Sequence, residues 1–380
     1  GYSPFTTSPA TVYNRYGYAM LGLIILEAFT PRNGTRTDAE FRGGASTAFL
    51  AVLLFFLKIT FFVAAVFLIV VLAFCRSQTG RRLAGLICGV VAMSLPFCAY
   101  FGFHMMPMIR DLITVAGAKR VHLRAYEWDS IVADEGVLVS FAIVTSVILL
   151  IHHRRNSARA VLIAAAAVGL GGVILILGNC EPHGLPLSLF FVLIAASRLD
   201  CKSLGNAQLF CGATLLWTSV FTATALAPSV LGFAYGTVLR STSALFGTPL
   251  AGKALAHFVP IDSDTEYREF VNDGLSLVQQ HRQPGDTVMS LDFTNPFSYG
   301  LGMKPAPGGT TALHYQTTFN DLHRPTAERL FGAARLVMVP KTFSDPSLQG
   351  SIPRLYGPYL ASHFRQAGES ARWRLYRSID

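Results

Sequence analysis

Long apolar runs separated by short polar segments dominate residues 1–228 of the chain. Two of these runs, residues 137–151 and 161–177, flank the segment HHRRNSARA, which carries Arg154, Arg155 and Arg159 and no acid. Roughly 20 apolar residues are enough to cross a bilayer as a helix. The pattern predicts a helical hairpin through a membrane; the alternative is a buried hairpin of a large soluble protein.

Five further runs extend this pattern, at residues 13–29, 47–75, 83–106, 188–196 and 208–227. The run at 47–75 is long for one span and contains Lys58, so it either tilts strongly or lies partly at the interface with Lys58 reaching toward water. The run at 13–29 is either a span or an interfacial helix. The prediction is an α-helical polytopic membrane protein with about seven spans.

Charge is distributed unevenly between the polar segments. Nine Lys or Arg and one acid lie at Arg15 and in the turns at 76–82, 152–159 and 198–202. In contrast, seven Lys or Arg and eight acids lie in the loops at 31–46, 107–136 and 181–187. Because Lys and Arg accumulate on the cytoplasmic side, the latter loops, and all residues after about 229, are predicted to be extracytoplasmic.

Composition supports a membrane protein, because 52% of the 380 residues are hydrophobic and only 14% are charged. Soluble domains have about 25% charged residues. Most of the net charge of +9 lies before residue 241, and residues 241–380 are nearly balanced, so no basic patch indicates nucleic-acid binding. All six cysteines precede residue 241, which argues against a C-terminal disulfide scaffold or zinc module. The chain begins at Gly1 without Met, and we expect a further N-terminal portion.

The pattern changes after residue 258 to that of a small, mainly parallel α/β domain. Helices are predicted at 265–281, 325–331 and 355–364, and buried strands at 287–291, 335–339 and 373–376. The chain thus divides into a transmembrane domain (1–228), an interfacial connector (229–258) and an extracytoplasmic α/β domain (259–380). A Gly- and Pro-rich stretch at 292–321 is predicted to be a binding loop or a lid. Its candidate sugar-binding residues are Phe293, Asn295, Tyr299, His314 and Tyr315.

Candidate chemistry lies in the predicted outer loops, because no motif of a soluble enzyme such as GxSxG or HExxH is present. A carboxylate there could remove a proton from an attacking sugar hydroxyl, and basic side chains could hold a lipid phosphate. The carboxylate candidates are Asp38, Glu40, Glu127 and Asp129. The candidate substrate-binding residues are Arg110, Lys119, Arg120, His122, Arg124, His104, Glu181 and His183. The alternative is that these are ordinary solvated loop charges.

The C-terminal strings GDTVMSLDFTNPFSYGL, RLVMVPK and WRLYR, with YNRYGYAML near the start, carry a resemblance to known proteins. They resemble bacterial multi-spanning envelope proteins similar to the GT-C glycosyltransferases, which take sugars from polyprenyl-phosphate donors. That family has an acidic motif in its first outer loop. The nearest matches here are Asp38-Ala39-Glu40 and Glu127-Trp128-Asp129.

The resemblance implies sugar transfer from a polyprenyl-phosphate-linked donor to a glycan or lipid acceptor, at the outer face of a bacterial inner membrane. No organic cofactor, metal site or nucleic-acid partner is expected, and a divalent cation is left open. Membrane lipids and other envelope-assembly proteins are the expected partners. The main alternative is a non-catalytic subunit of an envelope polysaccharide assembly or export complex. A transporter is less favoured, because the chain has no inverted repeat.

Overall fold

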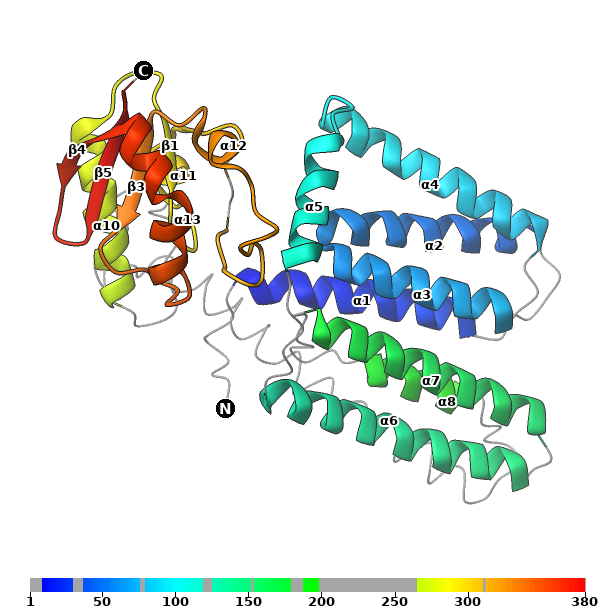
Figure 1. The fold of residues 1–380 in the computed structure, drawn as a ribbon. Coiled ribbons are helices and arrows are strands. Elements are labelled where there is room, and N and C mark those ends of the chain that lie inside the picture. The colour runs from blue at the N-terminus through cyan, green and yellow to red at the C-terminus, as the bar shows by residue number, and fades with distance from the viewer. Residues whose placement is uncertain are drawn as a thin grey trace, which may run out of the picture. The chain divides into compact units, whose positions relative to one another are not determined.

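The computed structural model describes residues 9–29, 37–75, 79–118, 125–151, 154–178, 187–197, 265–309 and 312–379. The chain forms two compact units (Figure 1). The helical unit comprises Gly1–His104 and His122–Ala234, and the C-terminal unit comprises Met105–Val121 and Tyr235–Asp380. The predicted span at 208–227 and the connector at 229–258 lie outside the described residues.

The described part of the helical unit consists of apolar helices, of which all but α4 contribute to one core, whereas α4 packs on α2. Their bounds are α1 (Pro9–Phe29), α2 (Thr37–Leu57), α3 (Ile59–Cys75), α4 (Gly80–Tyr100), α6 (Ala125–Ile151), α7 (Arg155–Leu177) and α8 (Leu187–Ser197). The core includes Leu21 of α1, Phe61 and Leu68 of α3, Val168 of α7 and Phe191 of α8.

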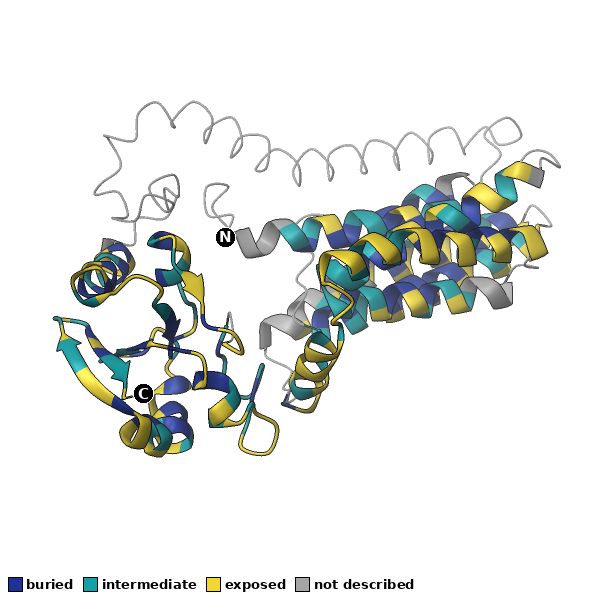
Figure 2. Ribbon diagram, turned by 90° about the horizontal axis from the view of Figure 1, so that it is seen from above, coloured by how far each residue is buried: buried dark blue, intermediate teal, exposed yellow. Residues whose placement is uncertain are grey.

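Three of the described helices are long and apolar enough to cross a membrane, namely α4, α7 and the part Asp38–Leu57 of α2. Exposed positions follow the outer faces of the helices (Figure 2), and many of them are apolar, including Leu83, Ile87 and Leu95 of α4. A broad exposed apolar surface is unfavourable in water and is expected against lipid. These helices indicate a membrane protein, but the prediction of about seven spans is not supported.

The long run at 47–75 is not one span. It is divided at Lys58 into α2 and α3, which lie side by side (Figure 1), and the Phe55 and Phe62 rings meet across the break at 5.1 Å. The polar segment before it is also partly helical, because α2 already begins at Thr37. The run therefore forms two helices joined by a reversal at Lys58, instead of the single span that the sequence pattern predicted.

Small residues allow α2 and α4 to approach backbone to backbone. A Cβ atom built on Gly85 would lie 2.0 Å from the carbonyl oxygen of Phe41, and one on Gly44 would lie 2.0 Å from that of Arg82. Such contacts are possible only for glycine, and close approach of this kind stabilises helix pairs in membranes.

The C-terminal unit contains a five-stranded sheet in the order β2-β1-β3-β5-β4. Its elements are α5 (Met106–Ala118), α10 (Thr265–His281), β1 (Thr287–Ser290), α11 (Phe297–Gly300), β2 (Lys304–Pro305), α12 (Ala327–Phe331), β3 (Leu336–Pro340), α13 (Leu348–His363), β4 (Phe364–Glu369) and β5 (Trp373–Ser378). β1 pairs in parallel with β2 and β3, whereas β5 is antiparallel to both β3 and β4. The sheet is mixed rather than mainly parallel.

Helices cover both faces of this sheet (Figure 1), as the alternation of buried side chains along its strands requires. Val288, Leu336 and Met338 pack with α10 and Trp373 in one cluster. Met289 and Val337, the intervening residues, pack with α12 and α13 in the other. The buried Trp373 indole donates a hydrogen bond to the Phe270 carbonyl at 2.8 Å, which ties β5 to α10.

The predicted helices and strands of this unit are confirmed with small shifts at their ends, except that α13 begins seven residues before the predicted start at 355. Leu348, Ile352, Tyr356 and Leu360 recur every fourth residue and are buried, so packing of this stripe outweighs the cost of two internal prolines. The edge strands β2 and β4 were not predicted. They are largely exposed and therefore lack an alternating apolar pattern.

Candidate functional site

The C-terminal unit has a cavity at the carboxyl ends of two neighbouring parallel strands, β1 and β3. After β1 the chain continues to β2, which lies on one side of this pair in the sheet. After β3 it continues to β4 and β5, which lie on the other side. Ligands of open α/β sheets bind where connections diverge in this way. The cavity here has a volume of about 400 Å³, within the range of roughly 300–1,000 Å³ typical of small-molecule sites.

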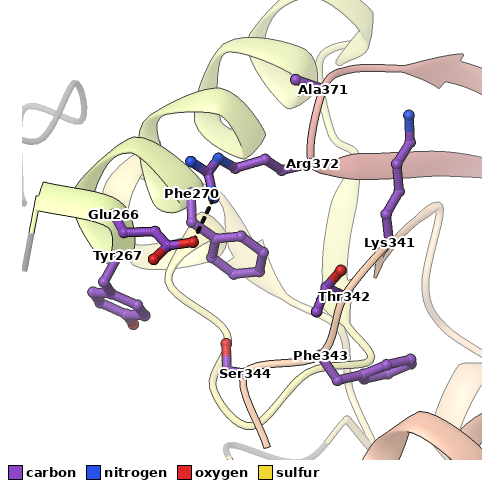
Figure 3. Close-up of a pocket in the computed structure, with 9 residues that line it drawn as sticks. All are labelled: Glu266, Tyr267, Phe270, Lys341, Thr342, Phe343, Ser344, Ala371 and Arg372. Carbon is purple, nitrogen blue, oxygen red and sulfur yellow. Dashed lines mark hydrogen bonds and ion pairs between the residues drawn. The ribbon is translucent and has the colours of Figure 1, made fainter. Parts of the chain in front are cut away.

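The cavity is lined by α10, the segment after β3 and the turn between β4 and β5 (Figure 3). The lining residues are Glu266, Tyr267, Phe270, Lys341, Thr342, Phe343, Ser344, Ala371 and Arg372. Figure 3 shows the Phe270 ring between the Glu266–Arg372 pair and the segment Lys341–Ser344. Aromatic rings, hydroxyl groups and charged groups are thus combined in one concave surface.

The buried carboxylate of Asp292 fixes one wall of the cavity. It follows β1 and accepts two hydrogen bonds from Ser344, which follows β3: one from the backbone N–H at 3.0 Å and one from the hydroxyl at 2.6 Å. Asp292 is only 4% exposed. The two strand ends are therefore held together by charge-assisted hydrogen bonds, which are stronger than neutral ones.

The opposite wall is held by Arg372. Its guanidinium group lies 3.4 Å from Glu266 and 3.2 Å from Glu269, both on α10, and its backbone N–H donates to Asp273 at 2.9 Å. The charge of the other cation, Lys341, is balanced by Glu369 at 2.5 Å. A hydrogen bond from Lys341 lowers the pKa of Glu369. The cations and acids around the cavity are largely paired, which suits an uncharged polar ligand.

Two of the predicted loop residues lie together, next to segments that line the cavity. The rings of Phe293 and His314 meet edge to face at 5.7 Å, and His314 Nε2 lies 3.5 Å from Asp345, the residue after Ser344. The neighbouring Thr294 hydroxyl lies 3.4 Å from the Tyr267 hydroxyl of the lining. The stretch at 292–321 therefore contacts the cavity lining through its first residues.

The other predicted loop residues are placed differently. Asn295 bridges the Val288 carbonyl and the Phe297 N–H, and so shapes the turn into α11. Tyr315 donates a hydrogen bond to Asp321 at 2.9 Å. Arg354 also donates a hydrogen bond to Asp321. The hydrogen bond from Arg354, followed by that from Tyr315, lowers the pKa of the Asp321 carboxyl group. Tyr299 is exposed on α11.

In the helical unit, α1, α2 and α4 meet at an ion pair that the sequence analysis missed. Arg82 donates to both carboxylate oxygens of Glu27, at 3.0 and 2.9 Å, and the Thr47 hydroxyl donates to the same carboxylate at 2.6 Å. The Arg82 side chain is 8% exposed. The signal was an acid inside an apolar run, since such a group requires a partner.

Asp38 and Glu40 belong to this same end of the unit. They lie in the first turn of α2, not in a loop, and Phe41 of that turn lies against Gly85 of α4. Residues 37–46 thus lie at the same end of the described helices as Arg82, whereas the sequence pattern predicted the two segments at opposite ends. The difference is caused by the reversal at Lys58, which lies between the two segments.

The other end of the helical unit is marked by Lys58, whose ammonium group lies 5.2 Å from the centre of the Tyr13 ring. Gly178, at the end of α7, lies against Thr60 near the same break, so α7 runs toward this end. α6 precedes α7 as its antiparallel neighbour (Figure 1) and therefore begins here. Glu127 and Asp129 belong to the first turns of α6, so the two predicted carboxylate pairs occupy opposite ends of the unit.

Two further candidates lie around the start of α5. His104 is exposed, and its Nδ1 atom lies 2.6 Å from the carbonyl oxygen of Gly102. Arg110 is exposed on α5, in the C-terminal unit. Lys119, Arg120, His122, Arg124, Glu181 and His183 lie outside the described residues, and the side chains of Glu127 and Asp129 are also not described. Within the described ranges, no group of three or more His, Cys, Asp or Glu side chains could hold a metal ion.

In comparisons with known proteins, no family model, no curated protein and no solved structure matches the chain.

Proposed function

We propose that this membrane protein binds a glycan in the cavity of its C-terminal unit, and that this binding serves transfer of a sugar from a polyprenyl-phosphate-linked donor during bacterial envelope assembly. The cavity at the ends of β1 and β3 is the observation that carries the proposal. It presents the rings of Tyr267 and Phe270 beside hydroxyl groups and paired charges. Sugar rings have apolar faces and polar edges, and this combination complements both.

Binding is tested on the full-length protein in detergent, with neutral oligosaccharides of hexose and of N-acetylhexosamine as probes in saturation-transfer NMR and calorimetry. Tyr267→Ala and Phe270→Ala should each weaken binding by roughly 2- to 10-fold, as expected for loss of one aromatic contact of about 0.5–1.5 kcal/mol. Ile379→Ala removes an exposed side chain of the same unit and should leave binding unchanged. Equal affinity in all four proteins would refute the assignment of the cavity.

For the catalytic part we propose Glu127 and Asp129, because they are close in sequence to the candidate phosphate-binding residues Arg120 and Arg124. Asp38 and Glu40 instead begin α2, at the end of the helical unit that holds the Glu27–Arg82 pair. Proteoliposomes containing polyprenyl-phosphate-linked hexose and the best-binding oligosaccharide should yield an elongated product, detected by mass spectrometry. Glu127→Gln or Asp129→Asn should abolish the product without weakening oligosaccharide binding.

The separation of the carboxylate pairs favours a second candidate, a non-catalytic subunit that presents a glycan to other envelope-assembly proteins. Its distinguishing result is retained oligosaccharide binding with no product from the wild-type protein. In that case Phe270→Ala should reduce glycan assembly in cells, whereas Asp129→Asn should not.

A further inference from the structure

The helix α5 combines an exposed apolar face with a polar face that is fastened to the C-terminal unit. Met106, Ile109 and Ile113 are 58, 40 and 65% exposed. Their spacing places them on one side of a helix. Asp111 and Ala118 lie on the opposite side, and Ala118 is fully buried.

Two contacts hold the polar face. Arg329 of α12 donates to Asp111 at 2.6 Å, and the Asn320 amide donates to the carbonyl oxygens of Ala118 and Gly117 at 3.1 and 3.4 Å. The last carbonyl groups of a helix lack partners within that helix, so Asn320 caps its carboxyl end. Asn320 is itself fixed, because its side-chain oxygen accepts the N–H groups of Leu322 and His323.

The connection to α4 indicates what covers the apolar face. Only residues 101–105 separate the end of this candidate membrane span from the start of α5. That length of chain reaches at most about 20 Å. Phe101 and Phe103 in the connection are 42 and 69% exposed, and Phe is among the apolar side chains that interfacial segments insert into lipid.

Charge supports the same partner. Residues 105–124 carry four Lys or Arg, at positions 110, 119, 120 and 124, and one acid, Asp111, which is paired with Arg329. Within α5 itself Arg110 and Asp111 balance, and the other three basic residues follow its carboxyl end in the sequence. An apolar helix face followed by a cluster of basic residues is suited to the surface of a membrane that contains anionic lipids.

We propose that α5 lies in the bilayer surface with Met106, Ile109 and Ile113 inserted among the lipids, and that its other face anchors the C-terminal unit there through Asp111 and Asn320. The proposal does not depend on the glycan-binding function. It assigns Arg329 and Asn320 a part in attachment of the unit to the membrane.

The test is photocrosslinking of the full-length protein in nanodiscs of phosphatidylethanolamine and phosphatidylglycerol. Benzoylphenylalanine is placed at Ile113 and, as the matched control, at the adjacent Thr114, whose side chain points toward the polar side. Lipid adducts measured by mass spectrometry should be at least fivefold more abundant at position 113, and Met106 as a second position should behave like Ile113.

Three results would overturn the proposal: equal lipid adducts at positions 113 and 114, no lipid adducts at 113 or 106, or adducts at 113 that join two copies of the protein. Because the Ile113 side chain is mostly exposed, the substitution should be compatible with folding. A monodisperse size-exclusion profile of each variant verifies this.

Discussion

Removal of the Asp292 carboxylate should loosen the cavity and destabilise the C-terminal unit. In Asp292→Ala, both hydrogen bonds to Ser344 are lost, and the Ser344 N–H must find water instead. A hydrogen bond to a charged group contributes about 1.5–3 kcal/mol. Because the adjacent cavity admits water, which partly satisfies Ser344, we expect a total loss of about 2–4 kcal/mol. Asp292→Asn keeps one acceptor and should cost about 1 kcal/mol.

The assay is urea unfolding of the full-length protein in detergent, followed by Trp373 fluorescence in a background with Trp128→Phe and Trp217→Phe. Trp373 is buried against α10 and reports unfolding of the C-terminal unit. With a slope of about 1–3 kcal/mol/M, the alanine variant should lower the midpoint by roughly 1–2 M. The reasoning fails if alanine and asparagine are equally destabilising, or if both lie within about 0.5 kcal/mol of the wild type.

Three further predictions concern other contacts. Gly85→Ala should lower the melting temperature of the detergent-solubilised protein, because the added Cβ atom would collide with the Phe41 carbonyl oxygen. Gly136→Ala is the control and should not lower it, because a Cβ atom there has no neighbour within 4 Å. Equal melting temperatures of the two variants would refute the close α2–α4 contact. Arg82→Met should cost about 2–4 kcal/mol by removing the guanidinium group that donates to both carboxylate oxygens of Glu27. Much of this loss should disappear in the Arg82→Met/Glu27→Gln protein, and additive losses would contradict the pairing. Burial raises the pKa of Tyr356 from 10.0 to about 12, so the folded state keeps this proton longer than the unfolded state. Stability should therefore fall between about pH 10 and pH 12 in the wild type and less steeply in Tyr356→Phe, as measured by alkaline urea titrations.

Local patterns sufficed for the regular elements of the C-terminal unit. The helix at 265–281 has the predicted bounds, because its apolar positions recur with helical period and its ends are polar. The strands β1 and β3 are short apolar runs and were also predicted. The start of α13 was missed because Pro353 and Pro358 argue against a helix, and only the buried stripe from Leu348 to Leu360 reveals why it forms.

The helical unit was less predictable, because its organisation depends on contacts between distant residues. The break at Lys58 lies in a continuous apolar run, and no turn residue marks it. That one reversal changes which loops share an end of the unit, and with it the expected position of Asp38 and Glu40. Glu27 and Arg82 are 55 residues apart, so neither could be assigned to the other from spacing.

The residues of the candidate site were likewise predicted only in part from the sequence. Phe293 and His314 were predicted from an aromatic, Gly- and Pro-rich stretch, and they do lie together beside the cavity lining. Tyr267, Phe270 and Arg372 were not predicted, since they belong to an ordinary amphipathic helix and to a turn between strands. Only the strand order, which brings α10 and that turn to the ends of β1 and β3, identifies them.

The divergence of connections at β1 and β3 places residues that recognise a ligand beside residues that stabilise the fold. In the segments that follow these strands, Leu291 and Phe343 belong to a core and Asp292 holds Ser344, so the fold constrains these four residues. Lys341 and Thr342 line the cavity without belonging to either core. A protein engineer could therefore retarget the unit by diversifying lining residues outside the cores, such as Tyr267, Lys341 and Thr342, while Leu291, Asp292 and Phe343 are kept. Natural descendants could likewise acquire a different ligand preference while keeping the same fold.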